Sequence, residues 1–313
     1  MARYEVIIIG GGPAGLTAGL YTSRAGLSSL LLERGVFGGQ IANAALVENY
    51  PGFPEGISGA ELGSLMHQQA TKYGLEIITA EVTGVTQEQP YSISTTEGSF
   101  EAPAIIIAAG SEYRKLGVAG EERLSGHGVS YCATCDGFFF RDREVGIVGG
   151  GDTAITDASE LTRHIKKVYV IHRRDQLRAG QVLQQRAFAN PKLEFIWDSV
   201  IEEVLGDKAV EGVTLRNVKT GQQSSLRLDG VFVAVGLMPN SQQFFNILEL
   251  DDTGYIVTDE TMATSAPGIF AAGDIRRNSP RQVASAVGDG ATAAISAFKY
   301  IQEIGNGARI TSP

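Results

Sequence analysis

Two cysteines, Cys132 and Cys135, are the only thiols in this chain of 313 residues, and only two residues separate them. They lie in the stretch SYCATCDG, residues 130–137. Such a pair suits three kinds of site: a metal site, an ordinary pair of buried thiols, or a redox-active disulfide. The spacing alone does not choose among the three.

Two glycine-rich segments repeat with an offset of 139 residues. YEVIIIGGGPAG begins at residue 4 and REVGIVGGGDTA at residue 143, and each predicts a strand, a glycine turn and a helix. In this pattern the first glycine makes a tight turn, the second admits a pyrophosphate to the helix N-terminus, and the third position stays small. The matching positions are Gly10 and Gly149, Gly12 and Gly151, and Gly15 and Ala154.

The strand that follows each motif ends differently in the two copies. LSSLLLERG, residues 27–35, places Glu33 where a carboxylate accepts hydrogen bonds from an adenosine ribose. KKVYVIHRR, residues 166–174, places His172 at the matching position, and a group of arginines follows: Arg173, Arg174 and Arg178. Guanidinium groups match the geometry of a 2′-phosphate. We therefore predict FAD or NAD at the first site and NADP at the second.

A metal site at the cysteine pair fails on the number of ligands. Tetrahedral zinc takes four ligands, whereas the pair has only His127 nearby. A dimer pooling two pairs would leave both nucleotide motifs unexplained. We expect no metal.

Composition limits the class of protein. Hydrophobic residues make up 43% of the chain and charged residues 19%, which indicates compact globular units. The net charge of −9 argues against nucleic acid or an anionic membrane as the main partner, because both attract basic proteins. No apolar run approaches the roughly 18 residues of a membrane span, and no segment indicates a signal peptide. The expected compartment is the reducing cytoplasm, where a lone CxxC is more often catalytic or metal-binding than structural.

The length predicts about two domains. Further buried strands are expected in 104–110, 230–236 and 268–274. We predict an α/β protein with two Rossmann-like dinucleotide-binding domains, each a three-layer ββα arrangement, the second inserted into the first. The first domain would comprise residues 1–114 and 245–313, and the inserted domain 115–244. The polar end of the chain, residues 305–313, is expected to be a frayed tail.

In combination, the motifs resemble those of the low-molecular-weight, bacterial-type (class II) thioredoxin reductases. They are GGGPAG, GGQIANAALVENYPGFPEGISG, CATCDGFFFR, GGGDTA, HRRDQLRA and GIFAAGDIRRNSPRQVASAVGDGATAA. The resemblance covers the chain from residue 4 to about residue 302. It implies an FAD domain, residues 1–114 and 245–313, and an inserted NADPH domain carrying the cysteine pair.

The resemblance implies a set of residues for each cofactor. FAD would be held by Gly10, Gly12, Gly15, Glu33, Gly39, Gln40, Asn49, Gly273, Asp274, Arg281, Gln282 and Val283. NADPH would be held by Gly149, Gly151, Asp152, Thr153, Ala154, His172, Arg173, Arg174 and Arg178.

The resemblance also implies how the cysteine pair works. NADPH would reduce FAD, the reduced flavin would open a Cys132–Cys135 disulfide, and the dithiol would reduce thioredoxin through thiolate attack. Cys135 would face the flavin and Cys132 would attack thioredoxin. Asp136 would donate a proton, since no histidine adjoins the thiols. A homodimer is implied as well, and a rotation between domains with hinges near residues 112–118 and 236–241.

Two positions differ from the family's pattern. Tyr131 stands where a small residue is common, and its ring is expected to reshape the thioredoxin contact or the approach to flavin. Thr156 stands where a glutamate is usual near the nicotinamide end. Three alternative functions remain open: a thioredoxin reductase supplied by ferredoxin, an oxygen-dependent dithiol oxidase, and a non-catalytic flavin scaffold. An intact arginine group argues against the first, and paired thiols argue against the last.

Overall fold

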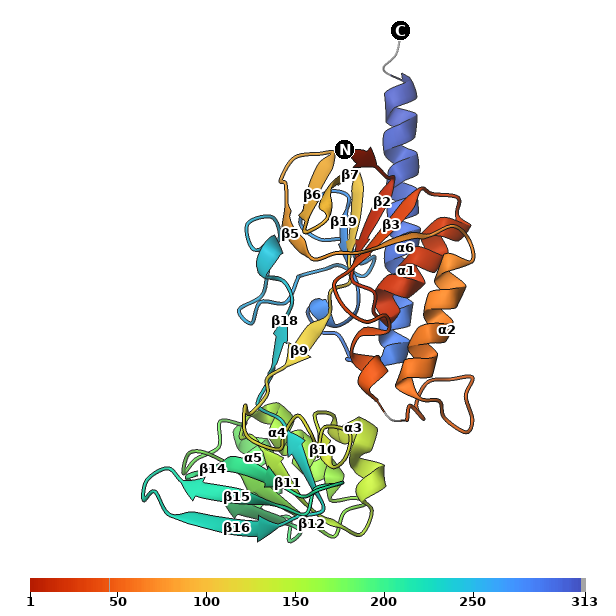
Figure 1. The fold of residues 1–313 in the computed structure, drawn as a ribbon. Coiled ribbons are helices and arrows are strands. Elements are labelled where there is room, and N and C mark those ends of the chain that lie inside the picture. The colour runs from red at the N-terminus through yellow and green to blue at the C-terminus, as the bar shows by residue number, and fades with distance from the viewer. Residues whose placement is uncertain (45, 311–313) are drawn as a thin grey trace. The chain divides into compact units, whose positions relative to one another are not determined.

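The computed structural model describes residues 1–44 and 46–310, which form two units (Figure 1). Of the described residues, those within 1–112 and 238–310 form the first unit and those within 113–237 the second. The chain crosses between them through β9 (Ser111–Tyr113) and β18 (Leu237–Pro239), which pair as a two-stranded sheet.

The first unit is built on a five-stranded parallel sheet with the order β19-β8-β2-β3-β4. Its strands are β19 (Ile269–Ala271), β8 (Ala104–Ile107), β2 (Val6–Ile9), β3 (Ser29–Glu33) and β4 (Glu76–Thr79). The central strands are continuous apolar runs, as both faces of a parallel sheet must be covered. The strands predicted in 27–35, 104–110 and 268–274 are confirmed.

Alternate residues of the central strand face two different layers. Val6 and Ile8 pack against the helices α1 (Pro13–Arg24), α2 (Gly59–Thr71) and α6 (Val283–Ile310), which lie together on one face (Figure 1). Ile7 and Ile9 pack against the antiparallel strands β5 (Val82–Val85), β6 (Tyr91–Thr95) and β7 (Gly98–Ala102). A short β1 (Ala2–Arg3) joins this sheet beside β7. The unit therefore has the predicted three layers of antiparallel sheet, parallel sheet and helices.

The second unit repeats this plan. Its parallel sheet has the order β10-β17-β11-β12-β13, formed by β10 (Val129–Ser130), β17 (Gly230–Val233), β11 (Glu144–Val148), β12 (Lys167–Ile171) and β13 (Leu193–Ile196). One face packs against α4 (Asp152–Leu161) and α5 (Gln181–Phe188). The other packs against the antiparallel strands β14 (Ser199–Leu205), β15 (Gly212–Asn217) and β16 (Gln223–Arg227). Four of its strands lie in the same spatial order as their counterparts in the first unit. The edge strand differs, because β10 precedes the glycine motif of its unit in the chain, whereas β19 follows that of the first unit.

Short elements complete the fold. They are the 3-10 helices η1 (Gly39–Asn43), η2 (Gly137–Phe140), η3 (Gln242–Phe244) and η4 (Gly273–Ile275), and the helix α3 (Ala133–Asp136). The prediction of a frayed tail from residue 305 was wrong as far as residue 310, because α6 continues to Ile310; Gly305 lowers helix propensity without ending the helix. Residues 311–313 of that prediction lie outside the described residues. No helix within 1–44 and 46–310 is long and apolar enough to cross a membrane.

Candidate functional site

Some glycines of the first motif have no space for a Cβ atom, whereas one of them does. A Cβ atom added to Gly10 would lie 2.4 Å from the carbonyl oxygen of Ala108, and one on Gly15 would lie 1.8 Å from the carbonyl oxygen of Gly10. A Cβ on Gly12 would meet nothing within 4 Å. Gly12 is the N-cap of α1 and gives the helix no side-chain hydrogen bond. Open space and unpaired N–H groups at a helix start suit a pyrophosphate.

The glycines of the second motif differ in the same way in the space available for a Cβ atom. A Cβ on Gly149 would lie 2.5 Å from the carbonyl oxygen of Ala234, whereas one on Gly151 would meet nothing within 4 Å. Gly151 is the N-cap of α4, again without a side-chain hydrogen bond. Ala154 is buried at the third position, and Thr153 is exposed. The two motifs therefore present the same open surface in their separate units.

Glu33 lies at the end of β3, beside the first motif. Its carboxylate accepts hydrogen bonds from the backbone N–H groups of Gly11, at 2.5 Å, and Gly35, at 2.6 Å. Two carboxylate oxygens have about four acceptor positions, so capacity for ribose hydroxyls remains. Glu33 also lines a cavity in the same unit, together with Ile9, Gly10, Leu32, Arg34, Ala80, Glu81, Val82, Ala109, Asn240, Gln243 and Phe244. The cavity therefore reaches the first glycine of the motif, Gly10, and the Glu33 carboxylate.

The loop predicted to line the flavin region contacts the first motif. A Cβ on Gly39 would lie 3.3 Å from the Cα of Gly12. Gln40 donates a hydrogen bond to the carbonyl oxygen of Ser111. The Ser111 hydroxyl is buried and has no hydrogen-bond partner among the described residues. An unpaired buried hydroxyl on the residue that Gln40 contacts fits a site that is completed by a bound group.

Two predicted flavin-site residues far apart in sequence meet directly. The side-chain amide of Asn49 donates to the side-chain oxygen of Gln282 at 3.0 Å. Val283 starts α6 directly after Gln282 and packs against the cluster of Val47, Ile57 and Leu62. The structure thus brings together segments that the sequence separates by more than 200 residues.

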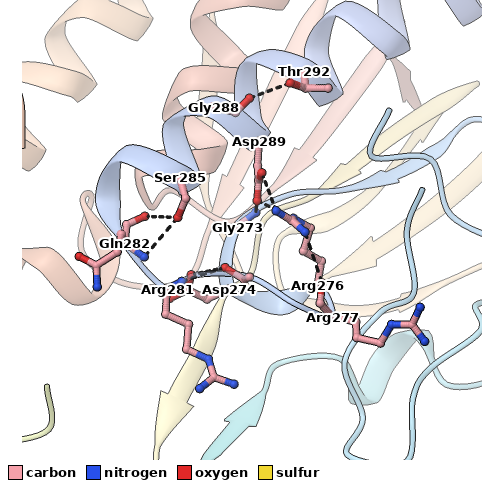
Figure 2. A network of polar contacts seen from close by, with 11 residues as sticks. Gly273, Asp274, Arg276, Arg277, Arg281, Gln282, Ser285, Gly288, Asp289 and Thr292 are labelled. Carbon is pink, nitrogen blue, oxygen red and sulfur yellow. Dashed lines mark hydrogen bonds and ion pairs between the residues drawn. The ribbon is translucent and has the colours of Figure 1, made fainter. Parts of the chain in front are cut away.

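A polar network holds the η4 turn, which carries Gly273 and Asp274 (Figure 2). The Gly273 N–H donates to Asp289 of α6 at 3.0 Å, and Arg276 forks onto the same carboxylate at 2.6 and 2.8 Å. Asp274 accepts a hydrogen bond from Ser279 at 3.0 Å. Burial raises the pKa of Asp274, against the opposing effects of Ser279 and the nearby arginines. The network fixes the turn against α6.

Arg281 adopts a left-handed backbone conformation, with φ of 59°. Its guanidinium lies over the ring of Tyr255, 5.5 Å from the ring centre, and donates to the Tyr255 hydroxyl at 3.4 Å. The side chain is thereby held by Tyr255 within the unit.

The loop that carries the arginine group is fastened to the second motif. The N–H groups of Arg178 and Ala179 donate to the carbonyl oxygen of Gly150, at 2.7 and 3.1 Å, and Asp152 accepts from the N–H of Gly180 at 2.7 Å. His172 lies against Gly150, where an added Cβ would meet its ring at 2.3 Å.

His172 is buried, whereas the arginines around it are exposed. Its Nε2 is hydrogen-bonded to the carbonyl oxygen of Gln176 at 3.0 Å. Its pKa is lowered first by burial and then by the charges of Arg178, Arg174 and Arg173. Among the described residues, none of these three guanidiniums forms an ion pair; the one carboxylate in the loop, Asp175, is paired with Lys219 at 2.8 Å. Three exposed guanidiniums without acidic partners suit a phosphate.

Cys132 and Cys135 form a disulfide, with 5.3 Å between their Cα atoms. Cys132 is partly buried and is the N-cap of α3, where its sulfur accepts the N–H of Cys135 at 3.2 Å. Cys135 is exposed. The Asp136 carboxylate accepts the Ser130 hydroxyl at 2.6 Å, and burial nevertheless raises the pKa of Asp136 above its ordinary value. A disulfide beside a partly buried carboxyl is equipped for thiol exchange with proton transfer.

Tyr131 occupies one of the two unusual positions, and its side chain contacts residues of the second unit. Its ring stacks on that of Tyr113, with 5.3 Å between ring centres, and its hydroxyl donates to Glu121 at 2.9 Å. Glu121 is 2% exposed and also accepts the N–H groups of Leu116 and Gly117. Burial raises the pKa of Tyr131. Thr156, the other unusual position, is exposed on α4.

Sequence patterns missed several residues that hold the sites in place: Ser130, Glu121, Arg276, Ser279 and Asp289. Ser130, Arg276, Ser279 and Asp289 lie inside quoted motifs, but the motifs assign them no role, because their partners are set by tertiary packing. Within residues 1–44 and 46–310, no group of three or more His, Cys, Asp or Glu side chains is arranged to hold a metal ion.

Comparison with known proteins gives consistent results. The profile of the family described as pyridine nucleotide-disulphide oxidoreductase matches residues 4–290. The chain is similar to a thioredoxin reductase of Listeria monocytogenes, with 53% identity over 304 residues that cover 96% of this chain and 95% of the relative. It is 48% identical to a thioredoxin reductase of Bacillus subtilis over 303 residues, 96% of each chain. The crystal structure of thioredoxin reductase from Streptococcus pyogenes has a TM-score of 0.93 and 47% identity, covering 96% of this chain and 99% of that one.

Proposed function

The chain belongs to the pyridine nucleotide-disulphide oxidoreductase family, and we propose that within it the protein is an NADPH-dependent thioredoxin reductase. The observation that carries the proposal is the Cys132–Cys135 disulfide, which lies in the same unit as a dinucleotide motif with an unpaired arginine group. The overall reaction consumes NADPH, a proton and oxidised thioredoxin and yields NADP⁺ and the thioredoxin dithiol.

FAD fits the first unit. That unit holds the open face at Gly12, the Glu33 carboxylate bonded to the N–H of the neighbouring Gly11, and the unpaired Ser111 hydroxyl. We assign FAD binding to Gly10, Gly12, Gly15, Glu33, Gly39, Gln40, Asn49, Gly273, Asp274, Arg281, Gln282 and Val283. When bound, FAD accepts two electrons from NADPH and supplies them to a disulfide.

NADPH fits the second unit. The uncapped start of α4 would bind its pyrophosphate, and Arg173, Arg174 and Arg178 would bind its 2′-phosphate. We assign Gly149, Gly151, Asp152, Thr153 and Ala154 to the same site. His172 would support the arginine loop from the position where it is buried against Gly150.

The cysteines and Asp136 would carry out the exchange with thioredoxin. A Cys132 thiolate would attack the thioredoxin disulfide to give a mixed disulfide, which Cys135 then resolves. The N–H of Cys135 that contacts the Cys132 sulfur would stabilise negative charge on that sulfur. Asp136 would deliver the proton that the leaving thiolate of thioredoxin takes up.

The neighbouring surface suits a protein substrate. Phe138 and Phe139 follow the disulfide directly and are 58% and 49% exposed. Large exposed aromatic side chains of this kind are favoured at protein interfaces. We further propose that the first unit is the FAD domain, predicted as residues 1–114 and 245–313, and the second unit the NADPH domain, predicted as 115–244. The units themselves divide at 112/113 and 237/238. We also propose that the enzyme is a cytoplasmic homodimer.

The test is steady-state oxidation of NADPH by the purified flavoprotein. Turnover is expected to depend on added oxidised thioredoxin and to disappear in the Cys132→Ser variant, which keeps its flavin. Equal rates with and without thioredoxin, rising with oxygen concentration, would instead favour an oxidase.

A further inference from the structure

Ser130 forms hydrogen bonds to both sides of the redox segment. It ends β10 and is 5% exposed. Its hydroxyl oxygen accepts the backbone N–H of Cys132 at 3.1 Å and donates to Oδ2 of Asp136 at 2.6 Å. The carbonyl oxygen of Cys132 is a second acceptor, but at 3.3 Å. A serine has one hydroxyl proton, and the short bond to a carboxylate is the stronger of the two.

The hydrogen bond from Ser130 to Asp136 closes a loop around the disulfide. Both cysteines lie between these two residues, and α3, which carries Asp136 at its end, is only four residues long. A helix of one turn has little intrinsic stability, so its end needs other contacts to hold its position. Ser130 supplies such a contact, and the same hydroxyl accepts the backbone N–H of Cys132, so the end of α3 is linked to Cys132.

We propose, on the basis of the function proposed above, that Ser130 is a positioning residue for thiol exchange. Its hydroxyl keeps the Asp136 carboxyl in a fixed relation to Cys132, so that the proton donor and the attacking sulfur stay aligned. Ser130 acts through Asp136 and does not itself transfer a proton to substrate.

Ser130 donates a hydrogen bond to the Asp136 carboxylate from the end of β10. The elements α4 and η2 pack against α3. Of these, η2 and β10 carry no titratable side chain, and α4 carries Asp152, Asp157 and Glu160. The pKa of Asp136 is raised by burial and lowered by the Ser130 hydroxyl. Removal of that hydroxyl therefore raises the pKa further, because the ionised carboxylate loses a donor.

The effect is measured on the NADPH-reduced holoenzyme, mixed rapidly with oxidised thioredoxin over a range of pH. Ser130→Ala is expected to slow thiol exchange by about tenfold, less than the 10²–10⁴-fold that a general acid contributes. The alkaline limb of its pH profile should move to higher pH, since an acid with a raised pKa keeps its proton longer. Ser130→Thr, which retains a hydroxyl, should restore both the rate and the profile.

The double variant tests whether Ser130 acts through Asp136. Asp136→Asn keeps the side chain's shape and removes its titration. In that background Ser130→Ala should cause no further loss and no shift of the profile. An equal tenfold loss in both backgrounds would overturn the proposal, as would an unchanged pH profile in Ser130→Ala. Flavin content and far-UV circular dichroism verify that each variant is folded.

A second measurement separates this proposal from the proposed function. Alkylation of Cys132 by iodoacetamide, in protein reduced with dithiothreitol, needs neither NADPH nor thioredoxin. Its pH dependence should differ between wild type and Ser130→Ala, and the difference should vanish when Asp136 is asparagine. If the wild type fails to reduce thioredoxin while this difference persists, the proposed function is wrong and the role of Ser130 stands. If the difference is absent, the role of Ser130 is refuted.

Discussion

Replacement of Asp289 by alanine tests how the flavin-site turn is held. The Asp289 carboxylate is 7% exposed and accepts three hydrogen bonds, two from Arg276 and one from the N–H of Gly273 (Figure 2). The Arg276 side chain is 15% exposed. Asp289→Ala therefore leaves the largely buried guanidinium with only a 3.3 Å hydrogen bond to the carbonyl oxygen of Arg277, and it removes the acceptor of the buried Gly273 N–H.

The size of the effect follows from burial. Removal of one partner from a buried ion pair costs about 3–5 kcal/mol, because the remaining charge is left uncompensated. Arg3 provides the control in the same unit: it contacts Glu101 at 2.8 Å but is 78% exposed. An exposed pair contributes roughly 0–1 kcal/mol. We expect Asp289→Ala to lower the free energy of unfolding of the first unit by about 3–5 kcal/mol, and Arg3→Ala by no more than about 1 kcal/mol.

Urea unfolding of the flavin-free protein measures this loss. Far-UV circular dichroism reports both units, whereas fluorescence of Trp197, the one tryptophan in the chain, reports the second unit. The Asp289→Ala transition should move to lower urea by circular dichroism while the Trp197 transition stays in place. The variant should also bind FAD more weakly in a flavin-fluorescence titration. A free energy within about 1 kcal/mol of wild type, matching Arg3→Ala, would refute the reasoning.

Two further predictions concern the cofactor motifs. Gly12→Ala should keep the fold and weaken FAD binding, because its side chain enters open space. Gly10→Ala should instead destabilise the protein, because its Cβ would meet a carbonyl oxygen at 2.4 Å. Thermal melting and flavin content measure both variants, and equal effects of the two would contradict the assignment. Arg174→Gln should raise KM for NADPH about ten- to hundredfold, from the roughly 1.5–3 kcal/mol of a charged hydrogen bond, and leave KM for NADH unchanged. Parallel steady-state measurements with the two nucleotides check this, and an equal rise for both would exclude a role in reading the 2′-phosphate.

Local signals predicted most of the framework. Each apolar run that ends in a glycine motif forms a strand, a turn and a helix, because these conformations depend on neighbouring residues. The repeat of the two motifs also predicted a second Rossmann-like domain, and the second unit has a parallel sheet of the same kind. The hydrogen bond between Asn49 and Gln282 joins two residues that family resemblance assigns to the flavin site, and that assignment stays a prediction.

The contacts that hold the sites could not be read from the sequence. Arg276 and Asp289 meet because α6 packs beside η4, and no spacing rule relates them. The sequence also did not predict where the Tyr131 side chain points, because its hydrogen-bond partner Glu121 lies in a loop with no motif. A polar side chain acquires its partner only when the tertiary fold is complete, so these interactions required the structure.

The most direct test of the account is anaerobic titration of the yellow protein with NADPH and with NADH, followed by addition of oxidised thioredoxin. The account predicts rapid flavin bleaching by NADPH and much slower bleaching by NADH. Thioredoxin should then restore the flavin colour in the wild type and fail to do so in Cys132→Ser. A flavin that NADPH leaves oxidised, or one that thioredoxin cannot reoxidise in the wild type, would contradict the proposed reductase.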